Sequence, residues 1–114
     1  MAFSDRRDIN MIKKTYHLQL DLTGTQFQDY NRSSLLFFDI ETTGLTARMS
    51  YIYLIGAIAW EDNCWKCTQW FAQNTMEEPD ILKEFLAYTQ DKTLLIHFNG
   101  DRFDIPYINE KCET

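Results

Sequence analysis

Two acidic side chains, separated by one residue, end an apolar run near the middle of the chain. Asp39 and Glu41 close the segment 35–41, whose other residues are all apolar. Because a strand alternates its side chains between two faces, Asp39 and Glu41 point the same way. The apolar residues before them fall on both faces, which is typical of a central strand covered on both sides. Two carboxylates this close repel each other unless a cation or another partner lies between them.

A third acid follows another predicted strand. Residues 93–98 form a strand pattern, residues 99–101 a turn, and residues 103–111 a helix pattern. Pro106 is tolerated only in the first turn of that helix, so the helix begins near Asp104. If strand 93–98 lies parallel to strand 35–41, Asp104 joins the other two acids at the carboxyl end of the sheet, where ligands bind in open α/β sheets.

Three converging carboxylates indicate a hard-cation site for Mg²⁺ or Mn²⁺. Two such ions about 3.5–4 Å apart activate a water and stabilise the leaving oxygen in phosphodiester hydrolysis. The plainer alternative for the first pair of acids is a strand that simply ends in polar residues.

The elements that must position these acids form an α/β pattern. The predicted elements are strands over residues 35–41, 50–60, 64–72 and 93–98 and helices over residues 77–90 and 103–111. The short turn at 61–63 joins antiparallel neighbours. The helix between the last two strands makes a crossover that places strand 93–98 parallel to strand 35–41. We therefore expect a mixed sheet in the order third, second, first and fourth of these strands, with the second antiparallel and helices flanking the sheet.

The first 33 residues are predicted to be an N-terminal extension packed on the domain formed by residues 34–114. Ser4 can cap a short helix over residues 5–14, and residues 16–22 alternate like a strand. A chain of 114 residues is long enough for one domain and too short for two.

The net charge of −6 argues against a broad electrostatic surface for nucleic acid. It does not exclude an enzyme that holds one strand end through metal ions, which supply positive charge themselves. The first ten residues lack the apolar segment of a signal peptide, and the longest apolar run, residues 51–60, is half the length that crosses a bilayer. We expect a cytoplasmic protein without membrane contact.

Two further candidate groups favour structural roles. Cys64 and Cys67 have the spacing of a zinc or redox pair, but on a strand they face opposite sides, and no second pair is present for zinc. His97 lies within strand 93–98 and is interpreted as a packed histidine rather than a general base.

Two segments resemble the motifs of a known enzyme family. Residues 38–45, Phe-Asp-Ile-Glu-Thr-Thr-Gly-Leu, resemble the first motif of the 3′–5′ exonucleases with four acidic catalytic residues (DEDD exonucleases) in the ribonuclease H-like superfamily. Residues 98–107 resemble their second motif. The overall layout, including residues 51–56, is similar to the YprB-type ribonuclease H-like domain over roughly residues 35–112.

The resemblance implies a role for each matched residue. Asp39 would bridge two metal ions, Glu41 would hold the ion that activates water, and Asp104 would bind the second ion through water. The residues that would contact the 3′-terminal nucleotide or line the path of the strand are Thr42, Thr43, Leu45, Asn99 and Phe103. Single-stranded substrates need such stacking surfaces.

The chain departs from the family pattern after the second motif. The third motif would supply a fourth Asp with a Tyr or His, whereas the only acids after Asp104 are Glu110 and Glu113. We therefore expect a C-terminally truncated domain, and two functions stay open. One is a metal-dependent 3′–5′ exonuclease-like domain acting at the 3′ end of single-stranded DNA or RNA, impaired by the missing acid. The other is a non-catalytic nucleic-acid-binding or protein-interaction module, including a homodimer formed through the exposed edge of strand 93–98.

Overall fold

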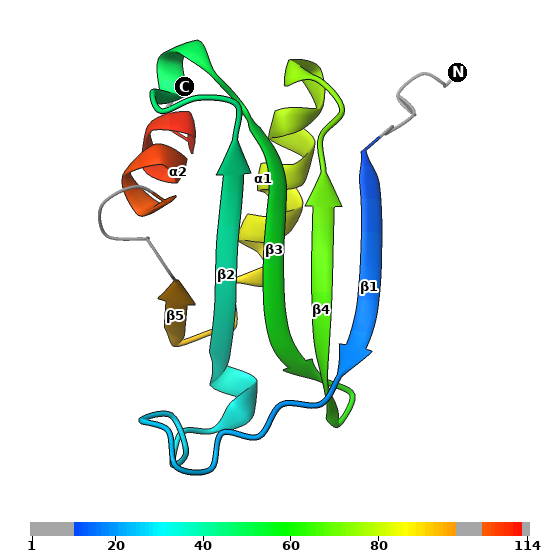
Figure 1. Cartoon of the computed structure of the whole chain (residues 1–114), viewed down its shortest axis with the longest axis vertical. Helices are drawn as coiled ribbons and strands as arrows, with labels where there is room; N and C mark the ends of the chain where they lie inside the picture. The colour runs from blue at the N-terminus through cyan, green and yellow to red at the C-terminus, as the bar shows by residue number, and fades with distance from the viewer. Residues whose placement is uncertain (1–10, 98–103, 113–114) are drawn as a thin grey trace.

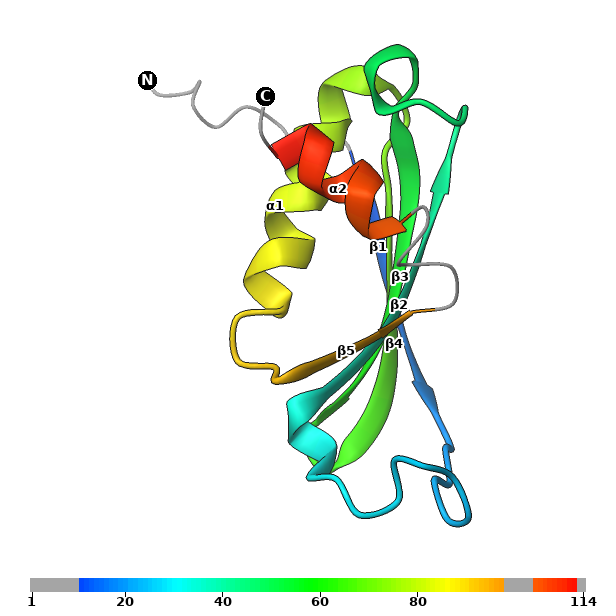
Figure 2. The same cartoon turned by 90° about the vertical axis from the view of Figure 1, so that its left-hand side faces the viewer.

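The computed structural model describes residues 11–97 and 104–112, which form a mixed sheet with two helices on one face (Figures 1 and 2). The strands are β1 (Ile12–Leu18), β2 (Leu35–Thr42), β3 (Ile52–Glu61), β4 (Cys64–Phe71) and β5 (Leu94–His97). The helices are α1 (Glu78–Tyr88) and α2 (Ile105–Cys112), and three short 3-10 turns lie at Arg32–Ser34, Ala47–Met49 and Thr75–Glu77.

The sheet has the strand order β1-β4-β3-β2-β5. β2 pairs in parallel with β5, and the β1–β4, β4–β3 and β3–β2 pairs are antiparallel. The order and directions predicted for β4, β3, β2 and β5 are therefore confirmed. The crossover through α1 explains the parallel pair, because a parallel neighbour cannot be reached by a short turn.

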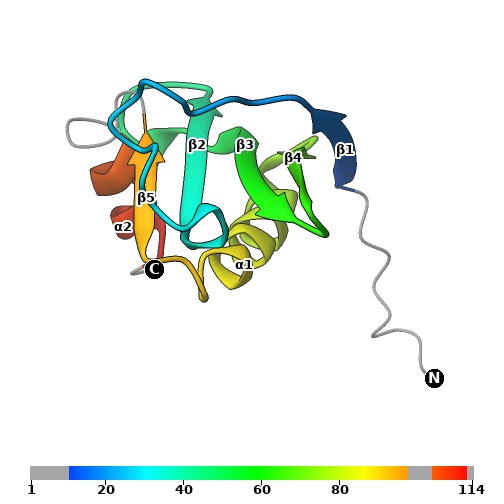
Figure 3. The same ribbon diagram turned by 90° about the horizontal axis from the view of Figure 1, so that it is seen from below.

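The N-terminal segment differs from the expectation. Residues 12–14 lie in a strand rather than a helix, and that strand ends at Leu18, so residues 19–22 lie outside it. β1 extends the sheet by pairing with β4 along its full length, from Ile12 opposite Phe71 to Leu18 opposite Trp65. The connection from β1 to β2 then passes from one edge of the sheet to the strand beside the opposite edge strand, β5 (Figure 3).

The two faces of β2 have different surroundings. On one face Phe38 packs on Phe85 of α1, with ring centroids 5.2 Å apart, and Trp70 of β4 packs on the same ring at 6.1 Å. We call this the helix face, and α2 adds the buried Tyr107 and Ile108 to its core. On the other face, which we call the open face, Phe37 contacts Phe27 of the β1–β2 connection at 5.7 Å.

The cysteines fit their predicted structural role, and two acids at the start of α1 are buried. Cys64 and Cys67 are free and half-buried, and burial raises the pKa of the Cys67 thiol, which fits a structural role. The charges of the first α1 turn, however, are not on a solvated face: Glu77 and Glu78 are only 6% and 8% exposed. Within the described ranges, neither α1 nor α2 is long and apolar enough to span a membrane.

Candidate functional site

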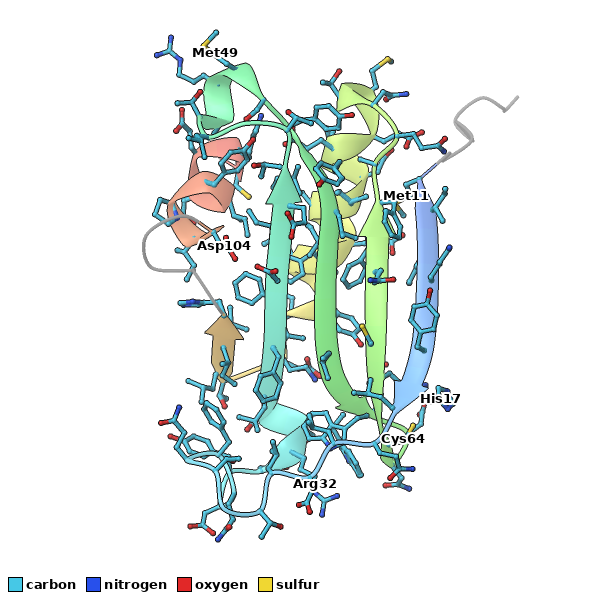
Figure 4. All side chains as sticks on the ribbon, in the orientation of Figure 1. Met11, His17, Arg32, Met49, Cys64 and Asp104 are labelled. Carbon is cyan, nitrogen blue, oxygen red and sulfur yellow. The ribbon has the colours of Figure 1, made fainter. Side chains whose placement is uncertain are left out.

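Asp39 and Asp104 come together where β5 ends. β5 pairs with β2 as far as His97, opposite Phe38, and no other residue that the structure describes pairs with β2 beyond that point on this side. The backbone N–H of Ile40 instead donates a hydrogen bond to the Asp104 carboxylate. Asp104 directly precedes α2 and lies next to β2 (Figure 4). The predicted convergence of these two acids is thus produced by a short strand followed by a helix start.

The environment of Asp104 opposes its negative charge. Its side chain is 1% exposed, and its Oδ2 atom has no hydrogen-bond partner among the described residues. Burial raises the pKa of Asp104 to about 6, and the charge of Asp39 contributes in the same direction. The Ile40 N–H and the more distant His97 lower the pKa, but they do not outweigh burial.

A divalent cation fits this arrangement. An unpaired, buried carboxylate oxygen beside a second carboxylate is costly without a positive partner. Carboxylate oxygens are the ligands that Mg²⁺ and Mn²⁺ prefer, so Asp39 and Asp104 have the donor chemistry to hold such an ion.

Glu41 lies on the same face of β2 as Asp39, as predicted, and both are exposed. In residues 11–97 and 104–112, no group of three or more His, Cys, Asp or Glu side chains is arranged to hold a metal ion. The structure therefore brings Asp39 and Asp104 together without adding Glu41 to the cluster. The register of β2 against β3 shifts between Glu41 and Thr42, and such irregularities commonly re-aim side chains next to active sites.

The two threonines after Glu41 shape the following loop. The hydroxyl of Thr42 donates to the carbonyl of Gly44 at 2.6 Å. The hydroxyl of Thr43 accepts a hydrogen bond from the backbone N–H of Tyr51 at 3.0 Å, which leaves its own hydrogen available to donate. A Cβ on Gly44 would lie 3.1 Å from the Cβ of Ser50, so a side chain here would require Ser50 to shift by a few tenths of an ångström.

Leu45 projects from this loop beside a hollow. Its side chain is 86% exposed. A cavity of about 230 Å³ lies between the loop and α2, lined by Leu45, Thr46, Ala47, Arg48, Pro106, Tyr107 and Glu110. The structure thus places the predicted nucleotide contact Leu45 at a cavity that also includes a cationic side chain, Arg48.

A polar network that the sequence did not predict holds α2 against the loop. Glu78 accepts a hydrogen bond from the backbone N–H of Ile52 at 2.8 Å, and its other oxygen lies 3.3 Å from Nζ of Lys111. Lys111 also donates to the carbonyl of Ser50 at 2.6 Å, and the Ser50 hydroxyl is hydrogen-bonded to that of Tyr107 at 2.5 Å. The network fixes the helix that begins beside Asp104.

The remaining predicted residues have plain outcomes. Asn99 and Phe103 lie outside the described residues. His97 packs edge-on against Phe38, with ring centroids 5.8 Å apart, as expected of a packed histidine.

A larger cavity, about 560 Å³, lies at the other end of the sheet. It is lined by the β1–β2 connection and the β3–β4 hairpin, including Arg32, Trp60 and Trp65. Arg32 stacks on Trp60 there, 4.5 Å from the ring centroid. Figure 4 shows Arg32 and Cys64 far from Asp104. None of the predicted site residues lines this cavity, so the chemistry of the acids gives the better candidate.

Comparisons with known proteins agree with this fold. Residues 36–114 match the family model described as RNase H superfamily, which covers more than half of the chain. A stretch of 46 residues is 41% identical to a protein named DNA polymerase from Ostreid herpesvirus 1 (isolate France) and covers 39% of this chain. The matched stretch is 2% of that polymerase, so the chain corresponds to a small part of it. No solved structure matches the chain.

Proposed function

The chain belongs to the RNase H superfamily, and from this premise we propose that it is a YprB-type, metal-dependent 3′–5′ exonuclease-like domain. Its substrate would be the 3′ end of single-stranded DNA or RNA. The observation that carries the proposal is the meeting of Asp39 with the buried Asp104, whose Oδ2 atom has no hydrogen-bond partner in the part of the chain that the structure describes.

Asp39, Glu41 and Asp104 would hold Mg²⁺ or Mn²⁺. Such an ion, when bound, activates a water and stabilises the leaving oxygen of a phosphodiester. The side chains contribute the charge and the position: Asp39 faces the substrate side of β2, and Asp104 is fixed by the Ile40 N–H. An ion would also remove the repulsion between Asp39 and Asp104.

The loop after β2 would receive the 3′-terminal nucleotide. Leu45 offers an apolar contact for the base at the mouth of the 230 Å³ cavity, and Arg48 offers a charge for a phosphate. Thr43 keeps a hydroxyl hydrogen with which to donate to the sugar or phosphate. Asn99 and Phe103 complete the proposed path of the strand by their resemblance to the family motif.

The similarity to a protein named DNA polymerase supports a nucleic-acid substrate. It extends over 46 residues, so it supports the local site rather than any larger assembly. The net charge of −6 is compatible with this substrate because the bound ions supply the local positive charge.

A gel assay tests the proposal. A 5′-fluorescein-labelled single strand is incubated with the protein and Mn²⁺, and we expect labelled products that shorten stepwise from the 3′ end. Asp39→Asn and Asp104→Asn are expected to abolish the shortening. Asp29→Asn, which removes a carboxylate in the exposed β1–β2 connection, is the matched control and should retain it. A strand that carries a 3′-phosphate block should shorten more slowly than the unblocked strand.

The other outcomes separate the two candidate functions. Binding of the strand without shortening, with and without Mn²⁺, would refute the exonuclease and favour a non-catalytic binding module. Calorimetry with Mn²⁺ on the wild type and on Asp39→Ala gives an independent reading. Equal, negligible heats of Mn²⁺ binding for both proteins would refute the proposed metal site.

A further inference from the structure

Residues from four strands form a row across the open face, starting at Asp39. Asp39 is paired with Gly56 of β3, Gly56 with Gln69 of β4, and Gln69 with Lys14 of β1. Residues that pair directly across neighbouring strands point to the same face. The row therefore leads from the candidate site to the outer edge of the sheet.

The row has no side chain at its second position. A Cβ built on Gly56 would meet nothing within 4 Å, so the space above this strand is open. Glycine weakens a strand interior, and it commonly marks a place where a ligand or another backbone approaches closely. The neighbouring rows on this face carry larger side chains: Leu54 and Phe71 on one side, Ile58 and Cys67 on the other. Above β3 the row is thus a shallow trough at Gly56, between the side chains of Leu54 and Ile58.

The outer end of the row is cationic and aromatic. Lys14 is exposed and forms no ion pair among the described residues, and its Nζ lies 5.9 Å from the ring centroid of Phe71. Tyr16, two residues along β1 on the same face, is 48% exposed. Lys13, by contrast, points to the helix face and pairs with Glu84 at 3.2 Å.

We propose that this row is a track for the single strand that extends upstream from the 3′ end. The backbone would pass over Gly56, the side chains of Gln69 and Lys14 would contact phosphates, and Tyr16 would stack on a base. The inference rests on the proposed function, because it takes the 3′ end at Asp39 as its origin. A basic groove combined with exposed aromatic rings is the usual surface for single-stranded nucleic acid.

The geometry sets the length of strand that the track can hold. Three strand spacings of about 4.8 Å place Lys14 about 14 Å from Asp39. At about 3.4 Å per stacked nucleotide, that distance corresponds to about four nucleotides. A dinucleotide therefore contacts only the candidate site, whereas a strand of twelve nucleotides also extends to Lys14 and Tyr16.

Fluorescence anisotropy with labelled dT12 and dT2 tests the track. Lys14→Ala should weaken the binding of dT12 and lower the slope of log K against log salt concentration by about 0.7, because one phosphate contact is lost. Lys13→Ala removes the same charge from the neighbouring position and should leave the slope unchanged. Tyr16→Ala should weaken dT12 binding about tenfold through the lost stacking. Binding of dT2 should be the same in all of these proteins.

Gly56→Val supplies a variant that separates folding from binding. Valine favours strands and its Cβ has open space here, so the melting temperature should be equal or higher. The new side chain fills the trough, and dT12 binding should fall about tenfold, as for the loss of a stacked base. A variant that melts no lower yet binds less cannot be explained by partial unfolding.

The possible results are distinct. If dT12 binds the wild type and if Lys14→Ala and Lys13→Ala behave alike, the track is wrong while the proposed function stands. If Gly56→Val changes the sedimentation coefficient of the protein alone, the face joins two copies of the chain, and the track is again wrong. If dT12 does not bind the wild type at all, the track is overturned, and the Mn²⁺-dependent shortening assay decides the proposed function separately.

Discussion

Replacing Asp104 by Asn is expected to remove a pH-dependent part of the free energy of unfolding of the metal-free protein. The pKa of Asp104 is raised from 3.8 to about 6, first by burial and then by the charge of Asp39. Between these two pH values the folded state holds a proton that the unfolded state releases. Protonation of Asp104 therefore stabilises the fold, and this contribution is complete below about pH 3.8 and is lost as the pH rises through about 6.

The size of the effect follows from the two pKa values. The difference between 3.8 and about 6 corresponds to about 3 kcal/mol of unfolding free energy. About 1.4 kcal/mol of it is gained between about pH 7.5 and pH 5, where most carboxylates of the fold still stay charged. An Asn side chain resembles the protonated acid and does not titrate, so Asp104→Asn should gain nothing from this source.

Urea denaturation in EDTA, followed by tryptophan fluorescence at a series of pH values, measures this effect. The difference in unfolding free energy between the wild type and Asp104→Asn should change by about 1.4 kcal/mol over that pH range, in favour of the wild type at the lower pH. In Asp39→Asn the corresponding pH effect should be smaller, because the charge of Asp39 contributes to the raised pKa of Asp104. A difference in unfolding free energy that is constant with pH would refute the raised pKa of the buried Asp104.

Further substitutions test the parts around the acids. Lys111→Met leaves Glu78, whose side chain is 11% exposed, without its cation and should cost about 2–3 kcal/mol in urea denaturation; a cost below about 0.5 kcal/mol would contradict the network. Gly44→Val places a side chain against Ser50 and should slow the shortening of oligonucleotides in the gel assay; unchanged shortening would show that this loop does not touch the substrate. Mn²⁺ at about 100 times its Kd should stabilise the wild type by about 2.7 kcal/mol in a thermal melt and leave Asp39→Asn unchanged; equal shifts would place the ion elsewhere.

The centre of the fold could be predicted because its sequence signals and its burial agree. Leu36, Phe38 and Ile40 alternate with Phe37 and the two acids, and the sheet buries them as that alternation requires. The Pro106 rule placed the start of α2 to within a residue, since proline restricts the backbone in any surroundings. These local constraints fixed the meeting of Asp39 with Asp104.

The edge of the sheet could not be predicted in the same way. Six of the seven residues of β1 are exposed, and only residues 16–18 belong to the alternation predicted over residues 16–22, so the first half of the strand gives no such signal. Its stability comes from backbone hydrogen bonds to β4, which any sequence can form. Charged residues such as Lys13 and Lys14 are common on edge strands, where they discourage pairing with other chains.

The electrostatics of the site also depend on contacts between distant residues. Nothing in the segment around Glu78 shows that Ile52 and Lys111 surround its carboxylate. Likewise, the sequence shows Asp104 as a carboxylate but not its loss of solvent. Burial is a property of the assembled sheet and helices, so neither could be predicted from spacing.

The long connection between β1 and β2 has a consequence for the order of assembly. β3 and β4 are joined by Asp62 and Asn63, both with positive φ, which is the type I′ turn that suits a two-residue hairpin. β1 and β4 are far apart in the sequence, and their paired residues nearest in sequence are Leu18 and Trp65. Closing that loop costs about 3 kcal/mol more entropy than closing the hairpin. We therefore expect the β3–β4 hairpin to form first and β1, the strand that carries Lys14, to be added to it afterwards.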